Sequence, residues 1–162
     1  YGPVFDSQDR TVKTGLAKEL EFQNSSYTSD SEFKLTLHLE TPLRLKFKNM
    51  FSDELPFHIL VRAMLRRISS LNNFFGQGEP PLDYSGLVNR SHKISVIDSN
   101  LKWLDWSRFS NRSQTRMQLG GLVGDITYSG HLEEYMGLMR YCQLVHVGKN
   151  TTFGLGKISI KT

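Results

Sequence analysis

The sequence is poor in cysteine, in long hydrophobic runs and in net charge. Cys142 is the only cysteine among 162 residues, so the chain can form neither an internal disulfide nor a cysteine-based zinc site, and a reducing, cytoplasmic setting is expected. No apolar run approaches the ~18 residues that a membrane span needs, so no membrane partner is expected. Lysine and arginine number 20 against 16 aspartates and glutamates, an excess that favours nucleic acid as a partner only weakly.

Several motifs of catalysis and nucleotide binding are also missing. Lys157 is followed by Ile158, so the chain lacks the hydroxyl with which a Walker A motif holds magnesium. The glycine-rich stretch precedes a strand-like run, whereas a dinucleotide fingerprint opens a helix. No zinc-protease helix motif, serine-centred elbow or carboxylate cluster occurs. The sequence therefore predicts no metal and no small-molecule cofactor.

The stretch from His146 to Ile158 is the most distinctive part of the chain. It holds three glycines, two lysines and two threonines. Glycine permits positive φ and close approach of the backbone to a ligand, and successive free N–H groups can form an anion-binding concavity. We therefore predict a phosphate-binding loop formed by Gly148, Lys149, Thr151, Thr152, Gly154, Gly156 and Lys157.

Two further segments carry exposed positive charge. A helix beginning at Pro56 has an apolar stripe, and its opposite face carries Arg62 and Arg66 but no carboxylate. The polar turn over residues 110–116 adds Arg112 and Arg116. These four arginines are predicted to contact an anionic partner. A third row, Arg44, Lys46 and Lys48 on an extended segment, is either a rail for backbone phosphates or a solvated edge that discourages strand pairing.

The order of the predicted elements defines the fold class. A strand alternating from Phe33 ends at Thr41-Pro42, and helices follow from Pro56 and over residues 84–93. Strands over residues 101–109, with both tryptophans, and 117–128 form a hairpin. A helix from near His131 and a final strand complete the chain. The predicted fold is α+β, ferredoxin-like β-α-β-β-α-β with an extra helix and a C-terminal glycine-rich loop.

Five blocks occur in a recognisable order, and together they resemble the C-terminal domain of the Cas6 family of CRISPR-associated endoribonucleases, in the RAMP superfamily, over about residues 33–160. The blocks are Thr41-Pro42-Leu43-Arg44-Leu45; Pro56-Phe57 with Leu65-Arg66-Arg67-Ile68-Ser69-Ser70-Leu71; Leu101-Lys102-Trp103 with Asp105-Trp106 and Phe109-Ser110; Met117-Gln118-Leu119-Gly120-Gly121-Leu122-Val123-Gly124; and His146-Val147-Gly148-Lys149 with Thr152-Phe153-Gly154-Leu155-Gly156.

The resemblance implies an activity and a partner. Cas6 proteins carry two ferredoxin-like domains and cut the repeat of CRISPR precursor RNA. Their cleavage is metal-independent: the ribose 2′-hydroxyl attacks the adjacent phosphate. The resemblance makes repeat RNA, and possibly other Cas proteins, the expected partners. Because the chain opens at Tyr1 without methionine, residues 1–30 are expected to be the end of an upstream domain plus a linker, and residues 31–162 the C-terminal RNA-binding domain.

No catalytic residue can be transferred by position, because the family's catalytic histidine usually lies in the N-terminal domain. Weak candidates for a general base are His58, His146 and His38; a structural or solvated histidine is the competing interpretation for each. Two alternatives to a processing enzyme stay open. One is a non-catalytic RNA-binding scaffold subunit of the same superfamily, and the other is a ferredoxin-like protein-interaction module.

Overall fold

The computed structural model describes residues 5–6, 8, 10–12, 20, 22, 31–46, 54–111 and 114–161. The strands are β1 (Phe5–Asp6), β2 (Thr11–Val12), β3 (Phe33–Leu43), β4 (Ser95–Leu104), β5 (Ser107–Ser110), β6 (Thr115–Gln118), β7 (Gly121–Gly130) and β8 (Ile158–Lys161). The helices are α1 (Phe57–Phe75), α2 (Tyr84–Ser91) and α3 (Met136–Val145), with short 3₁₀ turns η1 (Glu133–Tyr135) and η2 (Thr151–Phe153).

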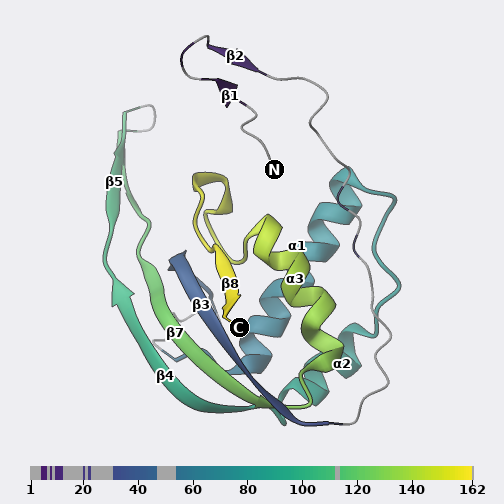
Figure 1. The fold of residues 1–162 in the computed structure, drawn as a ribbon. Coiled ribbons are helices and arrows are strands. Elements are labelled where there is room, and N and C mark those ends of the chain that lie inside the picture. The colour runs from purple at the N-terminus through teal and green to yellow at the C-terminus, as the bar shows by residue number, and fades with distance from the viewer. Residues whose placement is uncertain are drawn as a thin grey trace.

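A four-stranded antiparallel sheet is the frame of the molecule. Its strand order is β4-β7-β3-β8, and α1, α2 and α3 lie together on one face of it (Figure 1). With α2 set aside, the larger elements follow one another as β3-α1-β4-β7-α3-β8. This is the β-α-β-β-α-β order of the ferredoxin-like arrangement, and the predicted α+β class is confirmed.

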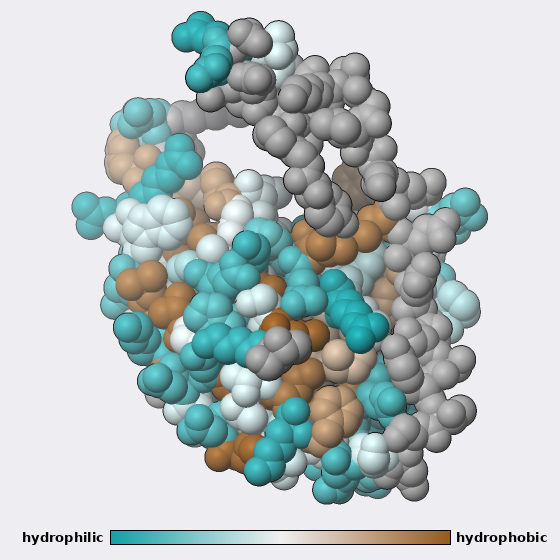
Figure 2. All heavy atoms as spheres, viewed as in Figure 1, coloured by the Kyte–Doolittle hydropathy of each residue, from teal (hydrophilic) through white to brown (hydrophobic). Residues whose placement is uncertain are grey.

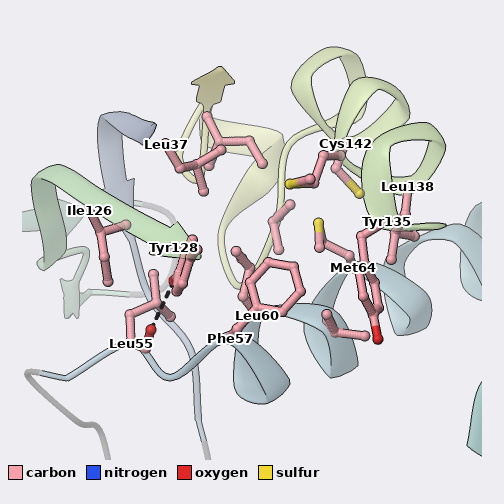
Figure 3. Packing of buried hydrophobic residues seen from close by; sticks show 14 of the residues in the cluster. Leu37, Leu55, Phe57, Leu60, Met64, Ile126, Tyr128, Tyr135, Leu138 and Cys142 are labelled. Atoms are coloured by element: carbon pink, nitrogen blue, oxygen red, sulfur yellow. Dashed lines mark hydrogen bonds between the residues drawn. The ribbon is translucent and has the colours of Figure 1, made fainter. Parts of the chain in front are cut away.

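The core lies between the sheet and the helices. Leu35, Leu37 and Leu39 alternate along β3 and are buried against the helices, as period-two patterning requires. Phe57 stands edge-on to Tyr128 and Tyr135, with ring centroids 4.8 and 5.0 Å apart. The buried Tyr128 hydroxyl donates to the Leu55 carbonyl at 2.8 Å, so this polar group is satisfied within the core (Figure 3).

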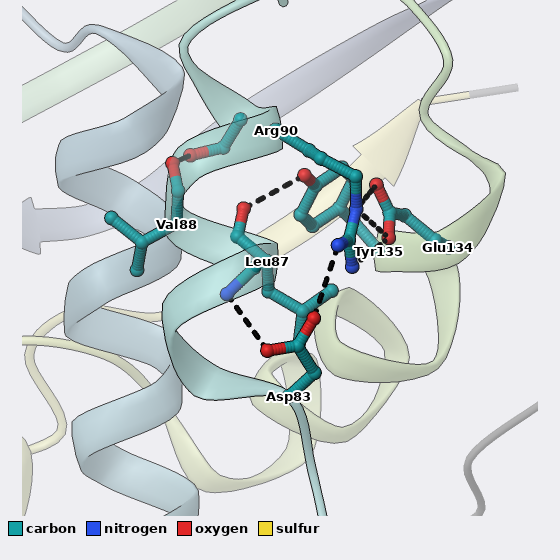
Figure 4. Close-up of polar contacts among 8 residues, drawn as sticks. Asp83, Leu87, Val88, Arg90, Glu134 and Tyr135 are labelled. Atoms are coloured by element: carbon teal, nitrogen blue, oxygen red, sulfur yellow. Dashed lines mark hydrogen bonds and ion pairs between the residues drawn. The ribbon is translucent and has the colours of Figure 1, made fainter.

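A polar network fastens α2 to the start of the third helix. The Arg90 guanidinium donates to Glu134 and to Asp83, and the Tyr135 hydroxyl donates to the Leu87 carbonyl at 2.9 Å (Figure 4). The Asp83 carboxylate also accepts from the Gly86 N–H at 2.9 Å and so caps the helix. The extra helix is therefore an integral part of the helical layer.

The first strand of the sheet is longer than predicted. It runs through Thr41-Pro42 to Leu43, with a register shift between Leu39 and Leu43 in its pairing with β7. Proline is tolerated at such an irregularity because its missing N–H is not needed there. The Pro42 carbonyl instead accepts from the Gly156 N–H at 3.1 Å. The expectation that Thr41-Pro42 ends the strand is wrong for this reason.

The hairpin is confirmed, but its strands are divided differently. The predicted strand over residues 101–109 is two strands, with Trp103 packed against the core and Trp106 exposed between them. The predicted strand over residues 117–128 is also two strands. They separate at Gly120, where an added Cβ would lie 2.7 Å from the Leu104 carbonyl oxygen, so another backbone approaches closely there.

The third helix begins later than predicted from His131. Residues Glu133–Tyr135 form a 3₁₀ turn, in which the Tyr135 N–H donates to the Leu132 carbonyl at 3.0 Å, and the α-helix starts at Met136. A 3₁₀ turn is a common entry into an α-helix. None of the helices in the described part of the chain combines the length and the hydrophobicity of a membrane-spanning segment.

Candidate nucleic-acid interface

The glycine-rich loop is closed by contacts at its base. The Val147 N–H donates to the Gly156 carbonyl at 2.9 Å, and His146 Nδ1 lies 3.1 Å from the Leu155 carbonyl oxygen. Thr41 ties the loop to β3: its hydroxyl donates to the Gly154 carbonyl at 3.0 Å and accepts from the Lys157 N–H at 2.9 Å. The C-terminal end of the loop is thus held by the strand whose continuation past Pro42 was not predicted.

Two glycines are required by the close packing of this loop. Gly156 has φ +72°, and an added Cβ would collide with the Val147 carbonyl oxygen. Gly148 has φ +87°, and its Cβ would lie 2.8 Å from the Arg44 carbonyl oxygen. Gly154 also has positive φ, +78°, but nothing lies within 4 Å of its added Cβ. The close approach is therefore to the protein's own backbone at Gly148 and Gly156, and only Gly154 borders open space.

Part of the predicted concavity of free N–H groups is not available to a ligand. Six backbone donors of the loop bond within the protein; they belong to Val147, Lys149, Phe153, Gly154, Gly156 and Lys157. The Lys149 N–H, for example, donates to the Arg44 carbonyl at 3.0 Å. A buried or loop amide that is already bonded cannot also cradle a phosphate. The interpretation of the loop as a backbone cradle is wrong for these six donors.

The loop instead forms one wall of a positively charged surface depression, the cationic hollow, of about 260 Å³. Its other walls are α1 and the segment that follows β3. Among the described residues that line it, six are cations and none is a carboxylate. The lining residues are Arg44, Leu45, Lys46, Ile59, Arg62, Ala63, Arg66, Arg67, Ser70, Gly148 and Lys149.

Two of these cations are held in place by the protein. Arg67 donates from Nε and Nη2 to the Val145 carbonyl, at 3.1 and 2.8 Å, which satisfies an acceptor at the end of α3. Arg44 donates to the Gly120 carbonyl at 3.1 Å, and its guanidinium lies 5.9 Å from the Trp103 ring centroid. Both arginines line the hollow, and their guanidiniums are held by these contacts.

The remaining positive charge comes from exposed side chains. Arg62 and Arg66 are exposed on α1, and within the described residues neither forms an ion pair; the same holds for Lys149. Uncompensated cations that converge on one hollow are suited to a polyanion. The structure thus brings together the predicted residues Arg62, Arg66, Gly148 and Lys149.

The other predicted contact residues lie elsewhere. The Lys157 ammonium pairs with Glu40 at 2.6 Å, and this contact is the main reason why the pKa of the Glu40 carboxyl is lowered. Thr151, Thr152 and Gly154 lie in or after η2 on the outer side of the loop, and Arg116 is exposed on β6. Arg112 falls outside the described residues.

The three candidate histidines do not meet at one site. His38 Nδ1 lies 2.6 Å from Asp125 Oδ1 on the sheet face that the helices leave open, and Lys161 reaches the other oxygen of that carboxylate at 2.8 Å. His146 takes part in closing the loop. His58 stacks on His92 with ring centroids 4.0 Å apart, and its pKa is lowered first by burial and then by the nearby charges of His92 and Arg62.

Sequence reasoning missed part of the hollow. Arg44 and Lys46 belong to a charged row whose pattern also fits a solvated edge, and no pattern around Arg67 indicates that it lines the hollow. A larger depression of about 660 Å³ lies where α1 ends, lined among others by Phe75, Tyr141 and Glu79. It presents no cation, so it is less suited to an anionic ligand.

Comparisons with known proteins agree with this fold. Residues 37–158 match the model of the family described as CRISPR-associated endoribonuclease Cas6. A Cas6 product complex shares the fold with a TM-score of 0.55 and 19% identity over 80% of this chain, and Thermus thermophilus Cas6 does so with 0.55 and 14% over 79%. A partial Cas6-RT-Cas1–Cas2 complex gives 0.59 and 17% over 82%. No curated protein matches the chain.

The family match shows that the chain belongs to the family of CRISPR-associated endoribonucleases called Cas6, as the sequence blocks predict. The chain spans 51% and 53% of the length of the two Cas6 structures and 23% of the chain from the larger complex.

Proposed function

We propose that this chain binds CRISPR repeat RNA through the cationic hollow and serves in the processing of the precursor transcript. The observation that carries the proposal is the hollow itself, whose described lining holds six cations from three separate segments and no carboxylate. Phosphate contacts supply most of the affinity in such interfaces and orient the nucleic acid. The family match and the Cas6 complexes described above support repeat RNA as the polyanion and other Cas proteins as further partners.

The size of the hollow favours a backbone phosphate over a whole nucleotide. Its volume of about 260 Å³ falls below the ~300–1,000 Å³ of typical small-molecule pockets. Its arginines can bind phosphate oxygens in a bidentate way. A sugar–phosphate strand that crosses the hollow, with its bases outside, fits both observations.

We further propose that cleavage in the full-length protein is metal-independent, by attack of the ribose 2′-hydroxyl on the adjacent phosphate. Residues 31–162 would be the RNA-binding C-terminal domain, and residues 1–30 the end of an upstream domain and a linker. The scattered positions of His38, His58 and His146 support an active site built mainly from residues outside this chain, because a general base and a general acid must both reach one phosphate.

The first test is the salt dependence of RNA binding by the 162-residue chain. If Lys46, Arg62, Arg66 and Lys149 each neutralise one phosphate, affinity for single-stranded repeat RNA should fall by about 50-fold between 50 and 200 mM salt. The double variant Arg62→Gln/Arg66→Gln should then lose only about sevenfold over the same range, and bind more weakly at 50 mM. Fluorescence anisotropy of labelled RNA measures both quantities.

The matched control removes the same charge from the far end of the sheet. Lys34 and Lys93 lie where β3 and β4 begin, and Lys34 is separated from Arg44 by ten residues of largely extended chain, about 33 Å. The variant Lys34→Gln/Lys93→Gln should keep the steep salt dependence. Equal slopes for the two double variants would show that the hollow is not the phosphate site.

The second test is cleavage of the cognate repeat in EDTA, with the ends mapped. A 2′,3′-cyclic phosphate produced by the full-length protein but not by this chain supports the two-domain proposal. Cleavage by this chain alone would contradict the proposed location of the active site. Tight binding without cleavage by the full-length protein would instead favour a scaffold subunit.

A further inference from the structure

An exposed aromatic ring stands on the same loop as Lys149. Phe153, in η2, keeps 43% of its surface exposed, and it belongs neither to the buried core nor to the half-buried residues that pack against the core. Its position is fixed by the loop: the Phe153 N–H donates to the Asn150 carbonyl and the Gly154 N–H to the Thr151 carbonyl, each at 3.0 Å. The Phe153 ring is therefore held partly exposed to solvent and takes no part in the core.

A cation from a distant segment lies over this ring. The Arg108 guanidinium, on β5, is 5.9 Å from the Phe153 ring centroid, within the range of a cation–π contact. Figure 1 shows the β5–β6 hairpin extending past the sheet at the same end as the glycine-rich loop. Hydrophobic and hydrophilic side chains alternate over this part of the surface (Figure 2), where Trp106 and Phe109 are exposed as well.

Space remains next to Gly154. Nothing lies within 4 Å of a Cβ added to Gly154, the residue that follows Phe153. Lys149 and Phe153 are four residues apart, so their Cα atoms are separated by at most about 14 Å. A strand whose phosphate lies in the cationic hollow therefore passes within a few nucleotides of the ring.

We propose that Phe153, with Arg108 over its ring, is a stacking site for one unpaired base of the bound RNA. The inference rests on the proposed RNA-binding function and deepens it. Single-stranded bases are recognised by stacking on aromatic rings and guanidinium planes. The hollow then holds the strand by its charge, and Phe153 selects a register in which an unpaired base follows the bound phosphate.

The test compares Phe153→Leu with Phe75→Leu in the 162-residue chain. Phe75 is a matched control because it is an aromatic residue, 86% exposed, at the end of α1 and outside the cationic hollow. Phe153→Leu should weaken binding of repeat RNA by about tenfold with an unchanged salt slope, Phe153→Trp should restore it, and Phe75→Leu should have no effect.

A set of repeat RNAs, each with one abasic site at an unpaired position, locates the base. For one of these RNAs the chain with Phe153 and the Phe153→Leu variant should bind equally, since the stacking partner is gone from both. Equal behaviour of Phe153→Leu and Phe75→Leu, or the same tenfold loss on every abasic RNA, would overturn the stacking site while leaving the phosphate site intact. Loss of salt-sensitive binding in the unaltered chain would overturn both.

Discussion

Substitution of the loop glycines distinguishes a glycine needed only for its positive φ from one that is also needed for close packing. The sequence does not distinguish these two roles. Gly156 and Gly154 have nearly the same φ, +72° and +78°, but only at Gly156 would an added Cβ strike the Val147 carbonyl oxygen. The Gly156 carbonyl also accepts from the Val147 N–H, and the Gly156 N–H donates to the Pro42 carbonyl. Alanine at Gly154 costs only the left-handed conformation, about 1 kcal/mol. Alanine at Gly156 adds overpacking of about 1–3 kcal/mol and weakens two hydrogen bonds worth ~1 kcal/mol each.

The expected loss of unfolding free energy is therefore about 1 kcal/mol for Gly154→Ala and about 4 kcal/mol for Gly156→Ala. For a chain of this length these losses correspond to falls in Tm of roughly 2–4 °C and of at least about 8 °C. Urea unfolding followed by tryptophan fluorescence measures the difference directly, and an unchanged m-value shows that both variants report on the same transition.

Equal destabilisation of the two variants would refute the assignment of Gly156 as the structural glycine. RNA binding gives the second readout. Gly154→Ala should retain most of the affinity at a temperature where both proteins are folded, because the walls of the hollow do not include Gly154. Gly156→Ala should lose affinity, because its loop carries Lys149.

Three further predictions concern the core and the histidine pair. Tyr128→Phe should lower the unfolding free energy by about 1–3 kcal/mol, because it leaves the buried Leu55 carbonyl without its donor; a smaller loss in urea unfolding would mean that another donor replaces the hydroxyl. Burial raises the pKa of Cys142 to about 12, so a thiol reagent at pH 8 should label the native chain only as fast as it opens, and prompt labelling would contradict the packing. Because the pKa of His58 is lowered in the folded chain, the unfolded chain binds that proton more readily, and stability should fall as the pH drops below about 6.5. His58→Gln should flatten that fall between pH 7.5 and 5.5, and an unchanged pH profile would show that His58 is not its cause.

Local periodicity was enough to predict the central strand and the long helix. The alternation from Phe33 and the stripe of α1 both follow from burial on one side. The first half of β4 was not predicted, because its side chains are exposed on both faces. The backbone of such an edge strand is ordered by pairing with its neighbour, here β7, and a strand without a buried face carries no hydrophobic alternation for a sequence to display.

The composition of the hollow could be predicted only in part. Cations are easily found in a sequence, but which of them share a surface depends on contacts between segments about twenty and more than eighty residues apart, such as Arg44, Arg62 and Lys149. Which cations already have a partner within the protein likewise depends on the tertiary structure. Lys157 is paired with Glu40 and Arg67 with the Val145 carbonyl, and no pattern around either cation indicates these partners.

The glycine-rich loop shows why a motif can indicate the correct place for a different physical reason. Glycine reports that a backbone must adopt positive φ or approach something closely, but it does not say whether the neighbour is a ligand or the chain itself. At Gly148 the neighbour is the backbone of Arg44, just after β3, and at Gly156 it is the backbone of Val147, where the loop closes on itself. In the proposed function, RNA binding by this loop depends on the side chains that it presents, Lys149 in the cationic hollow and Phe153 beneath Arg108. Substitutions of those side chains, more than of the glycines, separate binding from folding.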